Sequence, residues 1–279
     1  MARSGQNGSV PILNKDMTLC ISLAARPSNI GTRFHNYLYE ALGLNYIYKA
    51  FAPADIEAAV AGIRGLPIRG AAVSMPYKEA VIPLVDRLDA SARAIASVNT
   101  IVNDGGVLTA YNTDYIAIAR LLKDHDVPAS HSVLLRGSGG MAKAVAAALR
   151  DAGFGNVTIV ARNEETGRAL AELYGFGWQA EVGASRADLL INVTPLGMAG
   201  ADESAQSFDD GAVATAQVVF DVVALPSETP LIKAARTAGK PVITGAEVIA
   251  IQAEEQFVLY TGVRPTPEQV RAASEFSRA

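Results

Sequence analysis

Residues 133–149 read VLLRGSGGMAKAVAAAL, and this stretch does more than any other to decide the fold. A short apolar run comes first, glycines follow, and an alanine-rich segment with a helical composition comes last. The spacing is G-x-G-x-x-A between a strand and a helix, which is typical of a loop that holds a dinucleotide pyrophosphate. Glycines let the backbone approach the anion, and the free N–H groups of the first helical turn bind it. The alternative is an ordinary glycine-rich turn. The candidate cofactor-binding residues of this loop are Gly137, Ser138, Gly139, Gly140 and Met141.

Short apolar runs alternate with helical patterns over the rest of the chain, which indicates an α/β protein with mostly parallel sheets. The expected strands are 19–23, 46–51, 70–74, 99–102, 107–110, 133–135, 157–161, 189–193, 218–223 and 241–244. The expected helices are 32–42, 54–64, 77–88, 112–123, 141–151, 165–174, 247–260 and 267–276. The 279 residues suit two domains, and the polar segment 124–132 separates two α/β series.

Composition and charge exclude several classes of protein. Hydrophobic residues make up 50% of the chain, which is enough for a packed core and argues against disorder. The net charge of −4, without basic blocks, makes nucleic acid or an anionic membrane a poor partner. The single cysteine, Cys20, builds neither an internal disulfide nor a cysteine metal cluster. No apolar run approaches the roughly 18–20 residues of a membrane span, and the polar residues 1–16 lack the apolar core of an export signal. We therefore expect a cytoplasmic protein without a metal.

The end of the second strand of the glycine-loop unit bears on the choice of cofactor. An NAD site usually carries Asp or Glu there, which binds the ribose 2′-hydroxyl. Here the strand ends in Val160-Ala161-Arg162-Asn163, without an acid at the tip. A guanidinium suits a 2′-phosphate, because it forms paired, charge-assisted hydrogen bonds with it. The sequence therefore predicts NADP rather than NAD. A solvated Arg162 is the alternative, and Glu164 and Glu165 would oppose a phosphate.

A nicotinamide enzyme also needs a protein group that moves a proton. Lys78 is a candidate, because Ser74-Met75-Pro76-Tyr77-Lys78 leads from a strand into the expected helix 77–88. This places the cation in the first helical turn, where the dipole disfavours it by about 0.3–1 kcal/mol. Asp114 lies in the first turn of another helix, and we interpret the two as a pair in which an ionised Asp114 orients Lys78. The alternatives are a surface lysine and an ordinary helix-start acid.

Other polar features are weaker candidates. His35 lies in an expected helix beside Asn36, where a structural hydrogen-bonding role is expected. His125 and His131 lie in the polar segment between the two series and are expected to be solvated. The small and acidic residues of 199–210 form either a solvated loop or a mobile flap over a site.

Ordered motifs along nearly the whole chain resemble those of the shikimate dehydrogenases, and in particular those of the shikimate-dehydrogenase-like branch of that family. The matching segments are Phe34-His35-Asn36, Val73-Ser74-Met75-Pro76-Tyr77-Lys78-Glu79, Ser97-Val98-Asn99-Thr100, Tyr111-Asn112-Thr113-Asp114, residues 137–142, Arg162, residues 192–198, Asp221-Val222-Val223 and Gln252.

The resemblance implies an oxidoreductase that links NADP to the interconversion of 3-dehydroshikimate and shikimate, or of a close cyclic hydroxy acid. It implies a substrate domain of residues 1–113 plus 249–279, a Rossmann-like, doubly wound NADP-binding domain of residues 114–248, and an active site in the cleft between them. Lys78 would be the acid–base residue and Asp114 its partner. By the same resemblance the substrate is bound by Ser74, Asn99 and Gln252, and the cofactor also by Thr194, Val223 and Gly245.

The departures from the family pattern lie mainly where it holds the substrate carboxylate. Two serines of that pattern correspond to Asn29 and Gly31 here, and its proline corresponds to Thr32. Three further family residues are replaced, by Ala72, Ala224 and Val248. A site built around hydroxyl pairs loses discrimination when they are lost. We therefore expect either that the protein turns over shikimate weakly or that its true substrate is a related polyol acid. Asn29 and Thr32 are candidate residues for binding that substrate. The alternatives are a quinate dehydrogenase and a catalytically weak NADP(H)-binding regulatory module. We expect the protein to be a monomer or a homodimer.

Overall fold

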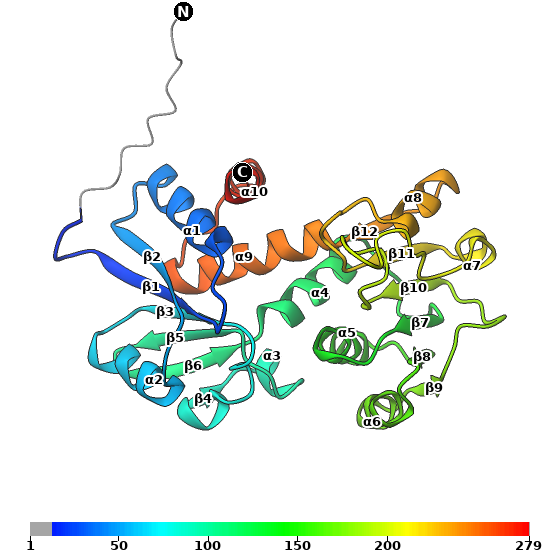
Figure 1. The fold of residues 1–279 in the computed structure, drawn as a ribbon, viewed down its shortest axis with the longest axis horizontal. Coiled ribbons are helices and arrows are strands. Elements are labelled where there is room, and N and C mark those ends of the chain that lie inside the picture. The colour runs from blue at the N-terminus through cyan, green and yellow to red at the C-terminus, as the bar shows by residue number, and fades with distance from the viewer. Residues whose placement is uncertain (1–12, 279) are drawn as a thin grey trace, which may run out of the picture.

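The computed structural model describes residues 13–278, which fold around two separate six-stranded sheets. The sheets lie side by side in two lobes, with helices packed around each (Figure 1). The expectation about an export signal in residues 1–16 falls mostly on residues outside the described range. None of the helices within 13–278 combines the length and the apolar composition that a membrane span requires.

The first sheet is mixed and has the strand order β2-β1-β3-β5-β6-β4. Its strands β1, β2 and β3 run parallel, whereas β5 runs antiparallel to both of its neighbours, β3 and β6. The strands are β1 (Thr18–Leu23), β2 (Tyr46–Phe51), β3 (Gly70–Val73), β4 (Arg87–Leu88), β5 (Thr100–Asp104) and β6 (Val107–Tyr111).

The second sheet is parallel throughout and has the order β12-β11-β10-β7-β8-β9. The chain starts at the centre with β7, adds strands on one side, and then returns to add β10 on the other side. This reversal creates a switch point beside β7, where open α/β sheets bind their ligands. The strands are β7 (Val133–Arg136), β8 (Val157–Val160), β9 (Gly177–Gln179), β10 (Leu189–Asn192), β11 (Val218–Asp221) and β12 (Val242–Thr244).

Alternate residues of the second sheet enter two different cores. Leu135, Ile159 and Ile191 face a large core that also contains apolar residues of α4 (Thr113–Asp124), α5 (Gly140–Asp151), α6 (Glu164–Tyr174) and the start of α9 (Gly245–Thr261). Leu134 and Leu190 face a second core, built with α7 (Asp210–Thr215) and α8 (Pro230–Thr237). Both faces of the sheet are therefore buried, which is why its strands are almost wholly apolar.

The first sheet is also covered on both faces. One core contains apolar residues of α2 (Ile56–Gly65) and of the short α3 (Ala90–Arg93). The other contains aromatic residues of α1 (Asn29–Ala41) and of the end of α9, together with α10 (Pro267–Arg278). The chain crosses between the lobes in α4 and α9, which pack against each other (Figure 1). The two-domain α/β architecture expected from the sequence is confirmed.

The expected helix 77–88 is wrong. Residues 75–81 form successive turns, Ile82–Leu84 form a single 3-10 turn (η1), and the chain then enters β4. Pro83 lies in the middle of the expected helix, where it removes a backbone donor and its ring clashes with the preceding turn. Lys78 therefore lies in a turn, and the argument from a helix dipole does not apply to it. The short strands β4 and β9 were not expected, because two or three residues carry no periodicity.

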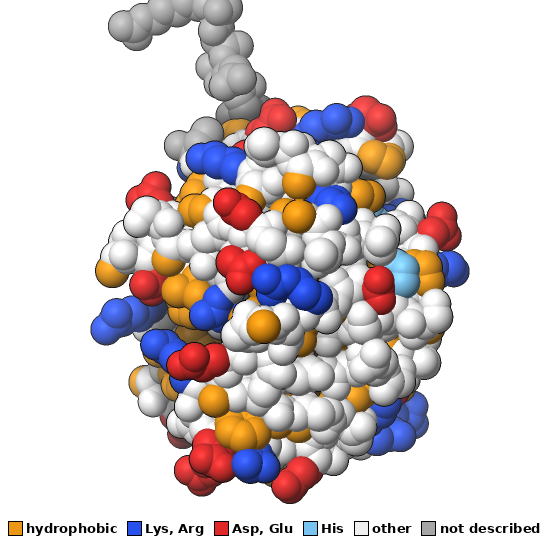
Figure 2. Space-filling model, turned by 90° about the vertical axis from the view of Figure 1, so that its right-hand side faces the viewer, with side chains coloured by type: hydrophobic (Ala, Val, Ile, Leu, Met, Phe, Trp, Pro, Cys, Tyr) orange, Lys and Arg blue, Asp and Glu red, His pale blue; other side chains and the backbone are white. Residues whose placement is uncertain are grey.

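The segment 199–210 is fixed at one end. Residues 199–204 are exposed, but Ser207 and Phe208 are each only 1% exposed, and Phe208 packs into the core beneath α7. Figure 2, which faces the lobe of the second sheet, shows basic and acidic side chains interspersed over this face of the molecule.

Candidate active site

Lys78 and Asp114 meet although they come from different parts of the first 114 residues. The Lys78 ammonium donates a hydrogen bond to Asp114 Oδ2 at a distance of 2.9 Å. Lys78 follows β3, and its carbonyl accepts from the Val98 amide, which ties the turn to the sheet. Asp114 is the second residue of α4, whose N-cap is the Asn112 side chain. The sequence-based interpretation of these two residues as a pair agrees with this geometry.

The pair opens into a cavity of about 340 Å³. Its walls come from the carboxyl ends of β1 and β3, the start of α1, and α9. Three of the substrate-binding residues expected from the sequence line it together with the pair, namely Ser74, Asn99 and Gln252. The structure thus brings five of the seven expected catalytic and substrate-binding residues to one cavity.

Asn99 is held in a single orientation. Its side-chain oxygen accepts hydrogen bonds from the Thr113 amide, the Thr113 hydroxyl and the Thr100 hydroxyl, at 2.8, 3.1 and 2.9 Å. Its side-chain nitrogen is buried and has no hydrogen-bond partner within residues 13–278. Because the oxygen is fully engaged, the amide N–H group is the part of Asn99 that is available to a substrate oxygen.

Asn29 and Thr32 are not among the residues that line this cavity. Ser28, Ile30 and Gly31 line it instead, and the Thr32 hydroxyl is buried without a partner in the described part of the chain. A Cβ atom on Gly31 would lie 3.6 Å from the Tyr48 hydroxyl. The glycine therefore leaves room directly beside that hydroxyl, in the region where the family pattern carries a serine.

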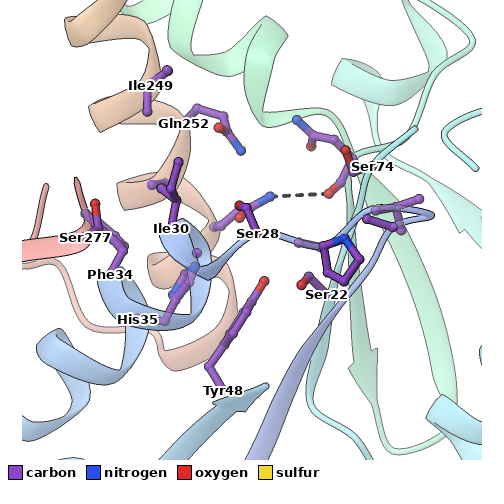
Figure 3. A pocket seen from close by; sticks show the side chains of 18 of the residues that line it. Ser22, Ser28, Ile30, Phe34, His35, Tyr48, Ser74, Ile249, Gln252 and Ser277 are labelled. Atoms are coloured by element: carbon purple, nitrogen blue, oxygen red, sulfur yellow. Dashed lines mark hydrogen bonds between the residues drawn. The ribbon is translucent and has the colours of Figure 1, made fainter. Parts of the chain in front are cut away.

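Further polar side chains of the cavity were missed by the sequence analysis. Ser22 and Tyr48 belong to the neighbouring strands β1 and β2, and Gln256 follows Gln252 by four residues on α9. Figure 3 shows the Tyr48 hydroxyl reaching toward the cavity between His35 and Ser22. The i, i+4 spacing of the two glutamines was a usable signal, whereas the meeting of Ser22 and Tyr48 depends on strand pairing.

His35 is a buried, uncharged part of the cavity wall. Its ring stacks on Tyr48 with the ring centroids 4.5 Å apart. Burial lowers the pKa of His35 from 6.5 to about 3. The imidazole is therefore neutral near pH 7. Its buried Nδ1 has no hydrogen-bond partner within residues 13–278, so the hydrogen-bonding role expected for His35 is not seen, and the ring acts through stacking instead. His125 is not simply solvated, because its Nε2 lies 3.1 Å from Glu247 Oε1.

A second cavity, of about 580 Å³, lies at the carboxyl ends of β7, β8 and β10, beside the switch point of the parallel sheet. Four residues expected to bind the cofactor line it, namely Gly137, Ser138, Arg162 and Thr194. Gly139 is the N-cap of α5, Gly140 is its first residue, and Met141 follows in its first turn. The free N–H groups of this turn are suited to an anion.

Comparison with known proteins assigns this arrangement to a family. Residues 29–101 match the family described as the shikimate dehydrogenase substrate binding domain. The chain is 53% identical over 268 residues to the shikimate dehydrogenase-like protein of Haemophilus influenzae, which covers 96% of this chain and 99% of that protein. The chain belongs to the shikimate dehydrogenase family.

Two more distant family members carry names that bear on the site. The chain is 38% identical over 250 residues to a shikimate dehydrogenase (NADP(+)) of Citrifermentans bemidjiense, with 83% of this chain and 85% of that protein covered. The structure of shikimate 5-dehydrogenase from Thermus thermophilus, in complex with NADP(H) and shikimate, is similar with a TM-score of 0.81 and 29% identity, and covers 94% of this chain and 100% of that chain. The resemblance inferred from the motifs is confirmed.

In this family member the glycine loop fits a dinucleotide. Gly137 has φ +126°, a conformation that favours glycine, and a Cβ atom there would lie 2.7 Å from the Val193 side chain. A Cβ atom on Gly139 or Gly140 would meet no atom within 4 Å, so the space above the loop is open. The loop therefore offers both the tight turn and the close approach that a pyrophosphate needs.

A buried network supports the loops on the other side of the switch point. Asn192 accepts from the Thr194 hydroxyl at 2.6 Å and donates to Asp221 Oδ1 at 3.0 Å. Asp221 in turn accepts from the Val223 amide and from the Thr229 hydroxyl. Burial raises the pKa of Asp221, and these donors oppose that rise. The network fixes Thr194 and Val223 relative to the ends of β10 and β11.

Gly245 and Val223 do not line the second cavity, but they lie against each other. A Cβ atom on Gly245 would be 2.3 Å from the Val222 carbonyl oxygen and 2.4 Å from the Val223 carbonyl group. Only a glycine at the start of α9 allows this contact with the end of β11. The two residues therefore form one backbone junction between the sheet and the helix that carries Gln252.

Proposed function

We propose that this protein is an NADP-dependent dehydrogenase that interconverts 3-dehydroshikimate and shikimate, or a close cyclic hydroxy acid. The observation that carries the proposal is the hydrogen-bonded Lys78–Asp114 pair in a cavity that also presents the free amide N–H group of Asn99. Membership of a family whose relatives are named shikimate dehydrogenases supports the reaction class.

The residues of the cavity have separate tasks in this mechanism. When bound, the reduced cofactor NADPH would supply the hydride for reduction, and NADP⁺ would accept it in oxidation. In the direction of reduction, the Lys78 ammonium donates a proton to the carbonyl oxygen as it becomes a hydroxyl. In the direction of oxidation, the neutral Lys78 amine takes that proton back. Asp114 stays ionised and holds the Lys78 nitrogen in place through their 2.9 Å hydrogen bond. Asn99 donates a hydrogen bond to a substrate oxygen and so fixes the orientation of the ring.

The preference for NADP is supported by Arg162, which follows β8 and lines the cavity beside the glycine loop. The names of two family members also include NADP. We further propose that residues 1–113 plus 249–279 form the substrate domain and residues 114–248 the NADP-binding domain. A cytoplasmic location is also part of the proposal, because a chain with a single cysteine forms no internal disulfide and suits a reducing compartment.

The test is a substrate panel of shikimate, quinate and amino-shikimate, each with NADP and with NAD, followed by the absorbance of the reduced nicotinamide. We expect activity with NADP on at least one of these acids. Lys78→Ala should lower kcat by about 10²- to 10⁴-fold, because it removes the acid–base group. Lys123→Ala, an exposed lysine in the last turn of α4, is the matched control and should keep full activity.

Other outcomes would replace the proposal. A preference for quinate with NAD would favour a quinate dehydrogenase. Tight binding of NADPH in calorimetry, with no substrate turned over and no coupling to any of the acids, would favour a regulatory module. Equal activity of wild type and Lys78→Ala would remove Lys78 from the mechanism.

A further inference from the structure

Arg136 is the last residue of β7 and directly precedes Gly137, so it stands at the entrance to the glycine loop. In the register of the sheet it is paired with Val160, at the end of β8. Arg136 and Arg162 both line the cavity of about 580 Å³. Two arginines, one at the end of β7 and one just after β8, therefore line the same space beside the expected pyrophosphate site.

Neither arginine forms an ion pair with a carboxylate in the described part of the chain. Glu181 and Asp202 nevertheless line the same cavity. Burial, and then the positive charge of Arg162, lower the pKa of Arg136, while the negative charge of Glu181 opposes this shift without cancelling it. Like charges that share a partly buried space repel each other, and an anion between them would relieve that repulsion.

Arg136 is also held in place before any ligand arrives. Its Nη1 donates to the backbone carbonyl of Ser207, which is buried at the fixed end of the segment 199–210. A guanidinium has five N–H donors in a rigid fork, so this bond leaves donors free for a ligand. A side chain that is already oriented loses less entropy when it binds.

We propose that Arg136 is a second arginine for the 2′-phosphate of NADP, the inner partner of Arg162, to which the sequence analysis already assigns that phosphate. The proposal rests on the proposed function, since it concerns the cofactor of that reaction. The cavity is at the end of β8, where dinucleotide-binding sheets hold the adenosine ribose, and this favours the 2′-phosphate over the pyrophosphate. Sequence motifs of the loop describe only its glycines, so they do not reveal the residue before them.

The test compares two ligands that differ only in the 2′-phosphate, adenosine 2′,5′-bisphosphate and 5′-AMP, by isothermal titration calorimetry on the full chain. Wild type should bind the bisphosphate more tightly. Arg136→Gln should weaken its binding by about ten- to a hundredfold, as expected for the loss of a charge-assisted hydrogen bond, and should leave 5′-AMP unchanged. Arg136→Lys should keep part of the preference because it keeps the charge. Arg162→Gln should show a similar loss.

The matched control is Arg186→Gln. Arg186 lies 3.5 Å from Asp209, which belongs to the same segment 199–210 as Ser207. Arg186 does not line the cavity, so its loss should change neither the affinity for the bisphosphate nor that for 5′-AMP. An unchanged preference in Arg136→Gln would overturn the proposal, and so would an equal loss for both ligands, which would mean a pyrophosphate contact or damage to the fold. These results differ from failure of the proposed function, in which wild type itself would show no preference for the 2′-phosphate.

Discussion

Asn99 combines a structural task with a proposed binding task in one side chain. Three donors occupy its oxygen, and its buried nitrogen is free among the described residues. Asn99→Ala leaves the amide and hydroxyl of Thr113 without that acceptor, so we expect a loss of about 1–3 kcal/mol in the free energy of unfolding. Asn99→Asp keeps the acceptor, but it replaces the N–H donor with a second carboxylate oxygen and adds a negative charge.

The two Asn99 variants therefore separate the tasks. Asn99→Asp keeps the three donors paired, and without the N–H group it should raise KM or lower kcat/KM by about ten- to a hundredfold. Urea unfolding and steady-state kinetics on the two variants provide the comparison. If Asn99→Asp binds substrate normally, the free N–H group has no part in recognition.

The buried His35 makes a defined contribution to acid sensitivity. Its pKa in the folded protein is about 3, below the ordinary value of 6.5, so the unfolded chain binds a proton that the folded chain does not. The stability contributed by neutral His35 is complete above pH 6.5 and is lost as the pH falls from there toward pH 3. The slope is about 1.4 kcal/mol per pH unit within this window.

His35→Phe tests this contribution. Phenylalanine keeps an aromatic ring against Tyr48 and removes the titrating group. Between about pH 4 and pH 6 the free energy of unfolding, measured in urea, should fall less steeply in the variant than in wild type, by the equivalent of one proton. Parallel lines for the two proteins would show that another group accounts for the slope.

At the scale of elements, the junction between β11 and α9 depends on Gly245. A methyl group there would lie 2.3 Å from the Val222 carbonyl oxygen, and the obstacle is backbone that cannot rotate away. We expect Gly245→Ala to cost about 3 kcal/mol of stability and to displace the start of α9. Gly155→Ala is the control, since a Cβ atom there would meet no atom within 4 Å. Thermal unfolding measures both variants. A melting temperature of Gly245→Ala similar to that of Gly155→Ala would contradict the expectation.

The elements show what could be predicted from sequence. Strands such as 133–135 and 189–193 were predicted because a parallel strand buried on both faces is a short apolar run. The helix 77–88 failed because Pro83 outweighs the helical pattern around it. Lys78, Asp114 and Asn99 were found because they belong to local motifs. Ser22 and Tyr48 were missed because they meet only through the pairing of β1 with β2.

At the scale of the whole molecule, the two lobes are joined by the ion pairs of the crossing helices. Arg120 on α4 donates to Glu254 and Glu255 on α9, at 3.0 and 2.9 Å, and Arg264 donates to the same two carboxylates. The Glu254 side chain is only 8% exposed, and both arginines contact it. The interactions with Arg264 and Arg120 lower the pKa of Glu255.

Arg120→Ala should therefore lower the free energy of unfolding by about 1–2 kcal/mol, with Arg264 retaining part of the network. The comparison is Arg236→Ala, which removes an exposed pair with Glu228 and should change stability by less than about 0.5 kcal/mol. Urea unfolding measures both variants. Equal effects would mean that the connecting helices gain nothing special from their charges.

The helix α9 begins at the Gly245 junction, carries Gln252 and Gln256 at the substrate cavity, and ends among the aromatic side chains of the first lobe at Phe257 and Tyr260. It is one continuous rod of 17 residues. A chimaera that exchanges lobes with a relative must consequently keep this helix whole and match its contacts at both ends, the Gly245 junction and the aromatic core of the first lobe. A splice inside it would join the Gly245 junction of one parent to the glutamine-bearing cavity wall of the other, and the two would no longer be aligned.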